Sequence, residues 1–498
     1  MLPFATVDPT VSADAVRALT KLHVEDLILP VLIQLGAIIF VARVFGALFR
    51  WLGQPGVVGE VVGGILMGPS LFGWLFPDLF AFVFRPDLPG VPDALTRAAF
   101  PKVFDVLAQI GLILLLFQIG LEFDFGHLKV KGRAAVLICV IGTAFPFALG
   151  VGLAPLVQGS LEPHPEKGPV PLFGLTLFLG TAMCITALPT LGRMMIEMGI
   201  NRTRMATVVV TAAAVGDAIG WILLATVAAL SASAYHPTET AKMVGLTVAF
   251  AAFMYLVVRP VLGRYFRKTL LKNQGQLSMN ALAVLLVALL VCSIATNKIG
   301  IFAIFGAFLL GALLSDEPAF RAAVTVRLRD FVNAFFLPIF FTNTGLRTDI
   351  NSLPGGTMWV VCGAVVAAAV VGKLGGCAVA ARLTGSSWRE SLLIGAMMNT
   401  RGLMELIVIN VGYDLGVIPR SLFCMLVLMA VITTMMTTPI VLWLRRGTEL
   451  EEPIARSGFL GGPLPPQAAE TRDRVDEECP TGGEPDERVT KRIARDRF

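Results

Sequence analysis

The stretch MATVVVTAAAVGDAIGWILLATVAAL, residues 205–230, decides the fold. It is apolar throughout and long enough to cross a bilayer as one helix. Asp217 lies about thirteen residues from each end, near the predicted bilayer centre. A carboxylate at that depth costs about 2.5–3.5 kcal/mol on insertion scales, and nothing structural in an Ala- and Val-rich helix needs it. We therefore predict a functional role for Asp217; the alternative is a carboxylate kept as a hydrogen-bond partner between helices.

The rest of the chain repeats this apolar pattern. Of its 498 residues, 55% are hydrophobic and 15% charged, and the mean hydropathy is +0.76; a soluble chain carries about 25% charged residues. The apolar runs are too long for the short alternating strands of a membrane β-barrel. We predict an all-α polytopic membrane protein. About thirteen helices are expected, at 27–49, 55–74, 104–122, 134–157, 171–197, 204–231, 241–264, 277–296, 299–315, 328–346, 357–381, 389–413 and 418–444.

Charged residues between the helices indicate the orientation. Alternate loops are rich in Lys and Arg, for example at 129–133, 264–272 and 321–329, whereas the loops between them hold only scattered basic residues. The positive-inside rule then places the N-terminus outside and the C-terminus in the cytoplasm. We expect an extracytoplasmic segment at 1–26, a membrane domain at 27–444 and a polar, disordered cytoplasmic tail at 445–498.

Two of the expected helices are interrupted. One reads GTAMCITALPTLGRMM, residues 180–195, with Pro189 in its interior, and the other reads GAMMNTRGLMELIVIN, residues 395–410. An interior proline removes a backbone hydrogen bond, and freed backbone groups at membrane depth must face protein or a cavity. The two interruptions are seven helices apart, and an odd offset is typical of an inverted repeat whose half-helices cross at the midplane. The alternative is a pair of kinked helices that merely pack.

Further charges lie inside the membrane domain. Lys373 lies about eight residues from the cytoplasmic end of its helix, and Asp217 is its obvious partner; snorkelling or plain structural pairing are the alternatives. Arg401 and Glu405 are one helical turn apart and could pair with each other, in a role that is more structural than functional. Arg401 at the break could also neutralise carbonyls at the C-terminal end of a half-helix. Glu60, in a glycine-rich helix, is equally compatible with a structural role.

Uncharged polar residues flank both interruptions. Thr181 and Thr186 lie near the first, and Asn399 and Thr400 form part of the second. Their oxygens, with freed backbone carbonyls, could bind a hard monovalent cation. A threonine in a membrane helix more often bonds its own backbone, however, so each residue alone is a weak signal.

These motifs together resemble the monovalent cation:proton antiporter-2 superfamily, with its sodium/proton exchanger fold. The resemblance covers about residues 27–444 and is similar in particular to plant and fungal endomembrane cation/proton exchangers and their bacterial relatives. It rests on GEVVGGILMGPSLFG at 59–73, IGLILLLFQIGLEFD at 110–124, ITALPTLGRMM at 185–195, AAAVGDAIGWILLA at 212–225 and NTRGLMELIVINVGYDLGVI at 399–418.

The resemblance implies a panel, or dimerisation, domain from helices at 27–122 and 277–346, and a core domain from helices at 134–231 and 357–444. It implies that Asp217 binds the ion and the proton, that Thr186 is the polar residue of the first crossing helix, and that Lys373 is the lysine found in many members. Many members place Asn or a second Asp before the binding aspartate, whereas this chain has Gly216. Gly216 favours one-for-one exchange slightly over electrogenic exchange.

The expected function is therefore secondary exchange of K⁺ or Na⁺ for H⁺ by alternating access, in a multi-pass protein of the bacterial inner membrane that forms a homodimer. The alternative is a sodium-coupled organic-anion symporter of the same fold. An enzyme is not expected, because no nucleophile–base pair or metal cluster stands out. The seven cysteines lack metal-ligand spacing, so we expect no cofactor and no metal beyond the transported cation. The net charge of +5 reflects cytoplasmic loops rather than a nucleic-acid partner.

Overall fold

The computed structural model describes residues 24–85, 93–122, 133–164, 168–201, 203–232 and 237–457. The described chain is almost entirely helical and has no strand beyond one isolated bridge between His164 and Gly168. The predicted extracytoplasmic segment, up to residue 23, and the predicted tail from residue 458 onward lie outside the described residues.

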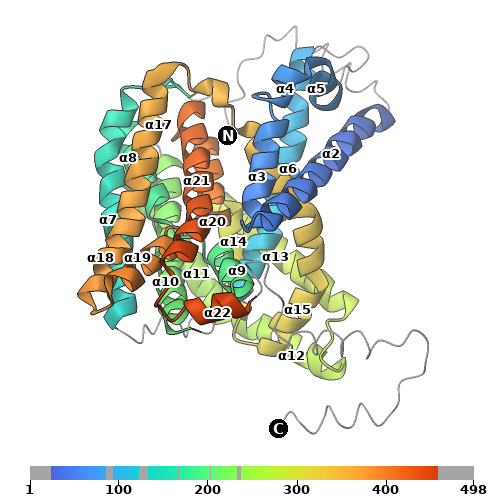
Figure 1. The fold of residues 1–498 in the computed structure, drawn as a ribbon. Coiled ribbons are helices and arrows are strands. Elements are labelled where there is room, and N and C mark those ends of the chain that lie inside the picture. The colour runs from blue at the N-terminus through green and yellow to red at the C-terminus, as the bar shows by residue number, and fades with distance from the viewer. Residues whose placement is uncertain are drawn as a thin grey trace, which may run out of the picture.

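The helices follow one another with short connections (Figure 1). They are α2 Val24–Trp51, α3 Gly56–Met67, α4 Phe72–Leu75, α5 Pro77–Phe84, α6 Asp93–Glu122, α7 Arg133–Gln158, α8 Leu172–Cys184, α9 Leu188–Glu197, α10 Arg204–Ala232, α11 Pro237–Phe253, α12 Arg259–Lys272, α13 Met279–Ile299, α14 Ala303–Leu314, α15 Pro318–Phe331, α16 Leu337–Arg347, α17 Gly355–Val370, α18 Gly376–Leu383, α19 Trp388–Met398, α20 Leu403–Asp414, α21 Arg420–Leu444 and α22 Glu451–Arg456. Single π-helical turns at Met254–Val258, Val332–Phe336 and Val371–Gly375 join α11 to α12, α15 to α16 and α17 to α18.

The predicted count of thirteen spans is not confirmed. In the described residues, ten helices are long and apolar enough to cross a membrane, or eleven if the bent pair α19 and α20 counts as one span. A helix does lie at each of the other two predicted positions. However, α14 has only 12 residues, and the helix formed by α15 and α16 is not among those long and apolar enough to cross a membrane.

The helices pack as two groups (Figure 1). The α6 group comprises α2–α6 and α13–α16, in which α14 packs along α6, and α3 packs between α2 and α16. The α10 group comprises α7–α10 and α17–α21, in which α7 packs along α8 and α18, and α21 contacts α17, α19 and α20. Contacts between the groups are fewer and include those of α16 with α20 and of α3 with α21.

Glycines allow the closest helix approaches within the α6 group. A Cβ on Gly120 of α6 would collide with the backbone of Phe308 in α14, and one on Gly311 of α14 would collide with the backbone of Phe117. Gly345 of α16 meets the backbone of α3 in the same way. Small residues at such contacts let helix backbones pack tightly where no hydrophobic effect drives association.

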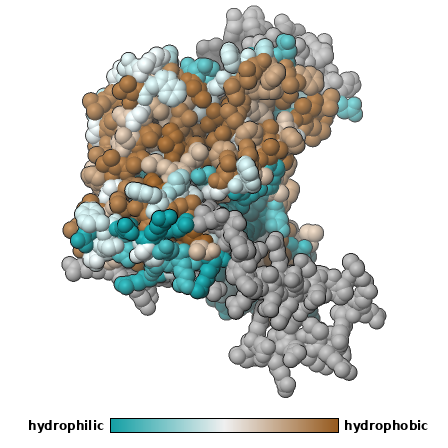
Figure 2. Space-filling model, viewed as in Figure 1, coloured by the Kyte–Doolittle hydropathy of each residue, from teal (hydrophilic) through white to brown (hydrophobic). Residues whose placement is uncertain are grey.

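The outer surface of the bundle suits a lipid environment. Many large apolar side chains are exposed, and α11 and α12 form one long apolar helix that is barely covered by the rest of the chain. Figure 2 shows a broad hydrophobic area on the face in view, with a hydrophilic region below it. A broad apolar surface of this kind is what a membrane-spanning protein presents to lipid.

The start of the predicted disordered tail is wrong by about a dozen residues. Residues 445–457 are folded and include α22, which lies across the lower end of the bundle (Figure 1). Leu450 and Ile454 are fully buried in an apolar cluster that also contains residues of α9, α10 and α19. Glu449 Oε1 accepts a hydrogen bond from the backbone N–H of Met205, at the first turn of α10, at 2.5 Å. Burial of two apolar side chains and this helix cap outweigh the polar composition of the segment.

Candidate ion-binding site

Both predicted helix interruptions are present, and they touch. The first separates α8 from α9 at residues 185–187, and the second separates α19 from α20 at residues 399–402, where the axis bends by 46°. The backbone N–H of Ala187 donates to the carbonyl of Thr400 at 3.2 Å. The two unwound segments therefore satisfy part of each other's backbone, as membrane depth requires.

Pro189 acts somewhat differently from the prediction. It occupies the second position of α9, so the helix ends before it rather than being broken at it. The reason is that Pro189 has no N–H to offer the carbonyl of Ile185, four residues earlier, while a proline in a first helical turn costs no hydrogen bond. The unwound segment consequently spans residues 185–187.

Two buried cations satisfy the carbonyls at the C-terminal end of α8. Arg401 donates to the carbonyls of Ala182 at 2.8 Å and Met183 at 2.7 Å. Lys373 donates to the carbonyl of Cys184 at 2.5 Å. These are the last three residues of α8, whose carbonyls have no partner within the helix and carry the negative end of its dipole. Arg401 thus lies where the sequence predicted, at the end of a half-helix.

The predicted direct pairing of Lys373 with Asp217 is wrong in this conformation. The second bond of the Lys373 ammonium goes to the carbonyl of Gly142 in α7, at 2.9 Å, and none of the ion pairs in the described part of the chain joins it to Asp217. Its charge acts on the carboxylate only across a longer distance. Lys373 also lies in a π-helical turn, a feature that is frequent at functional sites. The end of α8 is the stronger competitor for the ammonium because its carbonyls would otherwise be unpaired.

The predicted pair of Arg401 and Glu405 is present. Arg401 Nη1 lies 2.6 Å from Glu405 Oε2, and both side chains are fully buried. Glu405 Oε1 has no hydrogen-bond partner among the described residues. One guanidinium therefore holds α8 and α20 together across the crossing, and Glu405 supplies the charge that compensates it.

Threonines of α21 support the second break, and the sequence reasoning missed them. The Thr434 hydroxyl accepts from the backbone N–H of Arg401 at 3.1 Å and lies 2.9 Å from the Arg401 carbonyl. The Thr437 hydroxyl lies 3.3 Å from that of Thr400. The signal was present in the sequence as TTMMTT, residues 433–438, which places two pairs of threonines one helical turn apart.

Asp217 lies beside this crossing. Its side chain is only 6% exposed, and Oδ1 has no hydrogen-bond partner in the described chain. The backbone N–H of Leu188, the first residue of α9, acts on the carboxylate. One turn further along α10, Gly220 brings the helix so close to Ile185 that a Cβ would lie 2.9 Å from its side chain. The buried carboxylate therefore faces the first unwound segment.

The other predicted polar residues divide into two classes. Thr186 is fully buried, and its hydroxyl donates weakly to the Met398 carbonyl at 3.4 Å. Asn399 is almost fully buried with both amide atoms unpartnered in the described structure. Thr181 instead bonds its own helix, at the Leu177 carbonyl, as the alternative interpretation held. Asp217 Oδ1 and Asn399 Oδ1 are thus buried oxygens without partners in the described structure, and such oxygens are groups that a small hard cation can satisfy.

Comparison with known proteins identifies the family of this chain. Residues 36–444 match the family model described as the transmembrane sodium/hydrogen exchanger. The chain belongs to the sodium/hydrogen exchanger family. The family comprises transporters, which confirms that the protein is not an enzyme, and it supports the antiporter resemblance seen in the sequence.

Relatives of this exchanger chain include the Na⁺/H⁺ antiporter NhaS4 of Synechocystis, 38% identical over 83% of this chain and 97% of that protein. The cation/H⁺ antiporter 19 of Arabidopsis thaliana is 33% identical over 84% of this chain, and the chain spans about half of that plant protein. The K⁺/H⁺ antiporter 1 of Saccharomyces cerevisiae is 29% identical over 82% of this chain and 46% of that protein. These comparisons lend the symporter alternative no support.

The exchanger fold is shared with a solved structure, that of the sodium proton antiporter MjNhaP1 from Methanocaldococcus jannaschii. The match has a TM-score of 0.55 at 14% identity and covers 85% of this chain and 98% of that one. The predicted fold class is therefore confirmed: an all-helical membrane exchanger fold with two broken, crossing helices.

Proposed function

We propose that this chain exchanges a monovalent cation, K⁺ or Na⁺, for H⁺ across a bilayer. The names of its relatives include both Na⁺/H⁺ and K⁺/H⁺ antiporters, so the two cations both remain candidates. The observation that carries the proposal is Asp217, a buried carboxylate whose Oδ1 has no partner in the described chain, beside two crossing unwound segments.

The chemistry is competition for one carboxylate. A buried carboxylate is costly when charged and unpaired, so Asp217 holds either a proton or a cation. Both occupied states are close to neutral, so the site can switch from one side of the membrane to the other in either state. The empty site carries an unpaired buried charge, so the same switch costs much more free energy. Exchange follows from that competition without further machinery. Thr186 and Asn399 supply candidate oxygens for the cation, and Lys373 acts as a longer-range counter-charge.

Arg401 and Lys373 have a supporting role in this proposal. They neutralise the carbonyl end of α8, so the half-helix can end beside Asp217 without exposing unpaired carbonyls. With Thr400 and Pro189 shaping the two unwound segments, and Glu405 balancing Arg401, the crossing is a pre-formed frame around one ion. Gly216, which stands where many members have a second polar residue, favours one-for-one exchange.

We assign the two packing groups to a panel and a core that move relative to each other. The helices of the α6 group match the predicted panel ranges 27–122 and 277–346 to within three residues, and those of the α10 group match the predicted core ranges 134–231 and 357–444 equally closely. We place the N-terminus outside and the C-terminus in the cytoplasm of a bacterial inner membrane, because the basic loops lie on the C-terminal side.

A homodimer through the panel is the assembly that the family resemblance implies. Its test is the mass of the particle in lipid nanodiscs and in mild detergent, given 53.2 kDa per chain. A single chain in both media would contradict the dimer and would leave the exchange mechanism intact.

The test of function uses proteoliposomes with a trapped pH dye, challenged in turn with K⁺, Na⁺, Rb⁺ and Li⁺. We expect a response to at least one cation from the native protein and none from Asp217→Asn, which keeps the shape and removes the titration. Asp78→Asn makes the same chemical change at an exposed position of α5 and should retain exchange. Full exchange by Asp217→Asn, or no response of the native protein to any cation, would overturn the proposal.

A further inference from the structure

A cluster of charged and amide side chains joins the two helix groups far from the helix crossing. Its centre is Arg347, the last residue of α16 in the α6 group. Arg347 Nη2 lies 3.2 Å from Asp105 Oδ2 of α6 and 3.3 Å from Asp414 Oδ1 of α20. Arg347 Nη1 donates to Asn410 Oδ1 of α20 at 2.9 Å. One guanidinium thus bridges the α6 group, through Asp105, to the α10 group, through Asp414 and Asn410.

Neighbouring residues support this bridge and add a second link between the groups. The Asn410 amide donates to the Thr344 hydroxyl of α16 at 2.9 Å, which is a second bond between the groups. The Arg347 guanidinium lies over the ring of Tyr413, 5.6 Å from its centroid. The side chains of the ionic trio are 21–31% exposed. The bridge therefore lies at the rim of the interface, where water can reach it.

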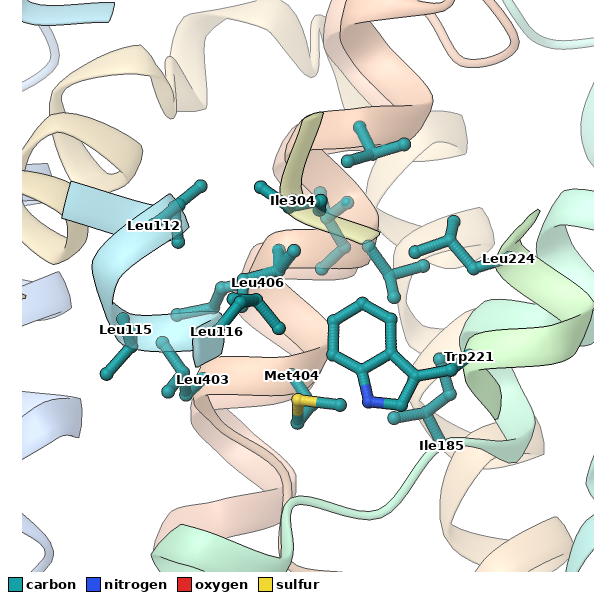
Figure 3. Packing of buried hydrophobic residues seen from close by; sticks show 14 of the residues in the cluster. Leu112, Leu115, Leu116, Ile185, Trp221, Leu224, Ile304, Leu403, Met404 and Leu406 are labelled. Carbon is teal, nitrogen blue, oxygen red and sulfur yellow. The ribbon is translucent and has the colours of Figure 1, made fainter. Parts of the chain in front are cut away.

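The bridge lies at the extracytoplasmic ends of its helices in the proposed orientation. Those ends are the C-terminal ends of α16 and α20 and the outer part of α6. An apolar layer lies deeper (Figure 3). The indole of Trp221, one turn beyond Asp217 on α10, stacks on Phe308 of α14 with ring centroids 5.4 Å apart. Leu112 and Leu116 of α6 complete this layer from the opposite group. On the outer side the two groups thus meet at two levels, through packed apolar side chains and through the ionic bridge.

The cytoplasmic side differs. Glu60, near the cytoplasmic end of α3, is mostly buried by its residue surface. Arg43, Arg50 and Arg193 are near enough to act on its carboxylate. Among the ion pairs between described residues, only that of Arg347 with Asp414 joins the α6 group to the α10 group. No ion pair of the described residues therefore holds the two groups together at their cytoplasmic ends.

We propose that Arg347 is an outer latch, a positioning residue that holds the two helix groups together while Asp217 faces the cytoplasm. Outward opening requires α20 to move away from α6 and α16, so the bonds of Arg347 to Asp414 and Asn410 must break in every transport cycle. The latch contributes only to the inward-facing state, and it therefore sets the balance between the two states rather than the chemistry at the ion site. This inference rests on the proposed alternating-access function.

The test measures access to the apolar layer directly. Leu112→Cys introduces a thiol at a buried position of that layer, about 10 Å deeper along α6 than Asp105 at 1.5 Å per residue. A membrane-impermeant maleimide is added from the extracytoplasmic side of intact spheroplasts. The labelling rate of the thiol introduced by Leu112→Cys is then compared between variants. The same variants are assayed for cation-driven proton movement in proteoliposomes.

We expect Arg347→Gln and Asp414→Asn each to raise the labelling rate at least about fivefold, the lower end of typical couplings between sites. The double variant Arg347→Gln with Asp414→Asn should raise the rate by less than the product of the two single effects, because both changes break the same contact. Arg259→Gln is the matched control, because Arg259 also pairs with an aspartate, Asp316, without joining the two groups; it should change nothing.

Unchanged labelling in both single variants, or an equal rise with Arg259→Gln, would overturn the latch. If Arg347→Gln does not fold, Asp414→Asn carries the test alone, since it removes one acceptor charge and keeps the side-chain shape. The labelling readout does not depend on exchange. Raised labelling in the variants with no transport by the native protein would therefore contradict the proposed function and leave the latch standing. Transport by the native protein with unchanged labelling in the variants would contradict the latch and leave the proposed function standing.

Discussion

Arg401 is the residue whose loss should cost the most stability, and the reason can be worked from its contacts. Arg401→Met keeps much of the side-chain volume and removes the charge. The carbonyls of Ala182 and Met183 then lose their donors, and the fully buried Glu405 loses its counter-charge. No water can replace these bonds, because Arg401 is 0% exposed.

The expected magnitude follows from similar buried pairs. Removing one partner of a buried ion pair typically costs about 3–5 kcal/mol. For a helical domain of about 400 residues, the entropy of unfolding converts each kcal/mol to about 1–2 °C of melting temperature. We therefore expect the apparent Tm of Arg401→Met to fall by about 3–10 °C.

The assay is thermal unfolding of the detergent-solubilised protein, followed by the remaining monodisperse fraction. Arg193→Met is the control, because Arg193 is also paired with a glutamate four residues on but is 54% exposed; such a surface pair contributes about 0–1 kcal/mol. Adding Glu405→Leu to Arg401→Met should recover part of the loss, since no buried charge is then left unpaired. Equal melting temperatures for Arg401→Met and Arg193→Met would refute this reasoning.

Three further changes test other parts of the structure. Lys373→Met leaves the Cys184 carbonyl without its donor, so it should lower the apparent Tm by less than Arg401→Met and slow exchange; normal values of both would show that the capping bond is dispensable. Gly345→Val should strongly reduce the folded yield, because a Cβ already collides with the backbone of α3 at Val61, and a normal monodisperse peak would contradict the close contact. Ile454→Ser should make residues 445–457 sensitive to protease from the cytoplasmic side while the membrane domain stays intact; unchanged resistance would contradict the docking of α22.

The positions of the two helix breaks show what can be predicted from local sequence. The unwound segments at 185–187 and 399–402 were predicted within a few residues, because proline and a polar run at membrane depth have local backbone consequences. The pairing of Arg401 with Glu405 was also local, being set by one helical turn. The folded start of the tail was missed, because its polar composition hides two apolar side chains that join a buried cluster with residues distant in sequence.

The sequence by itself determined the class of this protein: helices long and apolar enough to span a bilayer, one carboxylate near the midplane, and two interruptions at an odd offset. Those properties depend on residue type and spacing along one chain. Only the tertiary structure decided which groups meet, because partners far apart in sequence compete for the same charge. Lys373 was expected to pair with Asp217, but its ammonium bonds the carbonyls of Gly142 and Cys184. The end of a broken helix offers it unpaired acceptors, and no sequence pattern ranks those acceptors against a carboxylate.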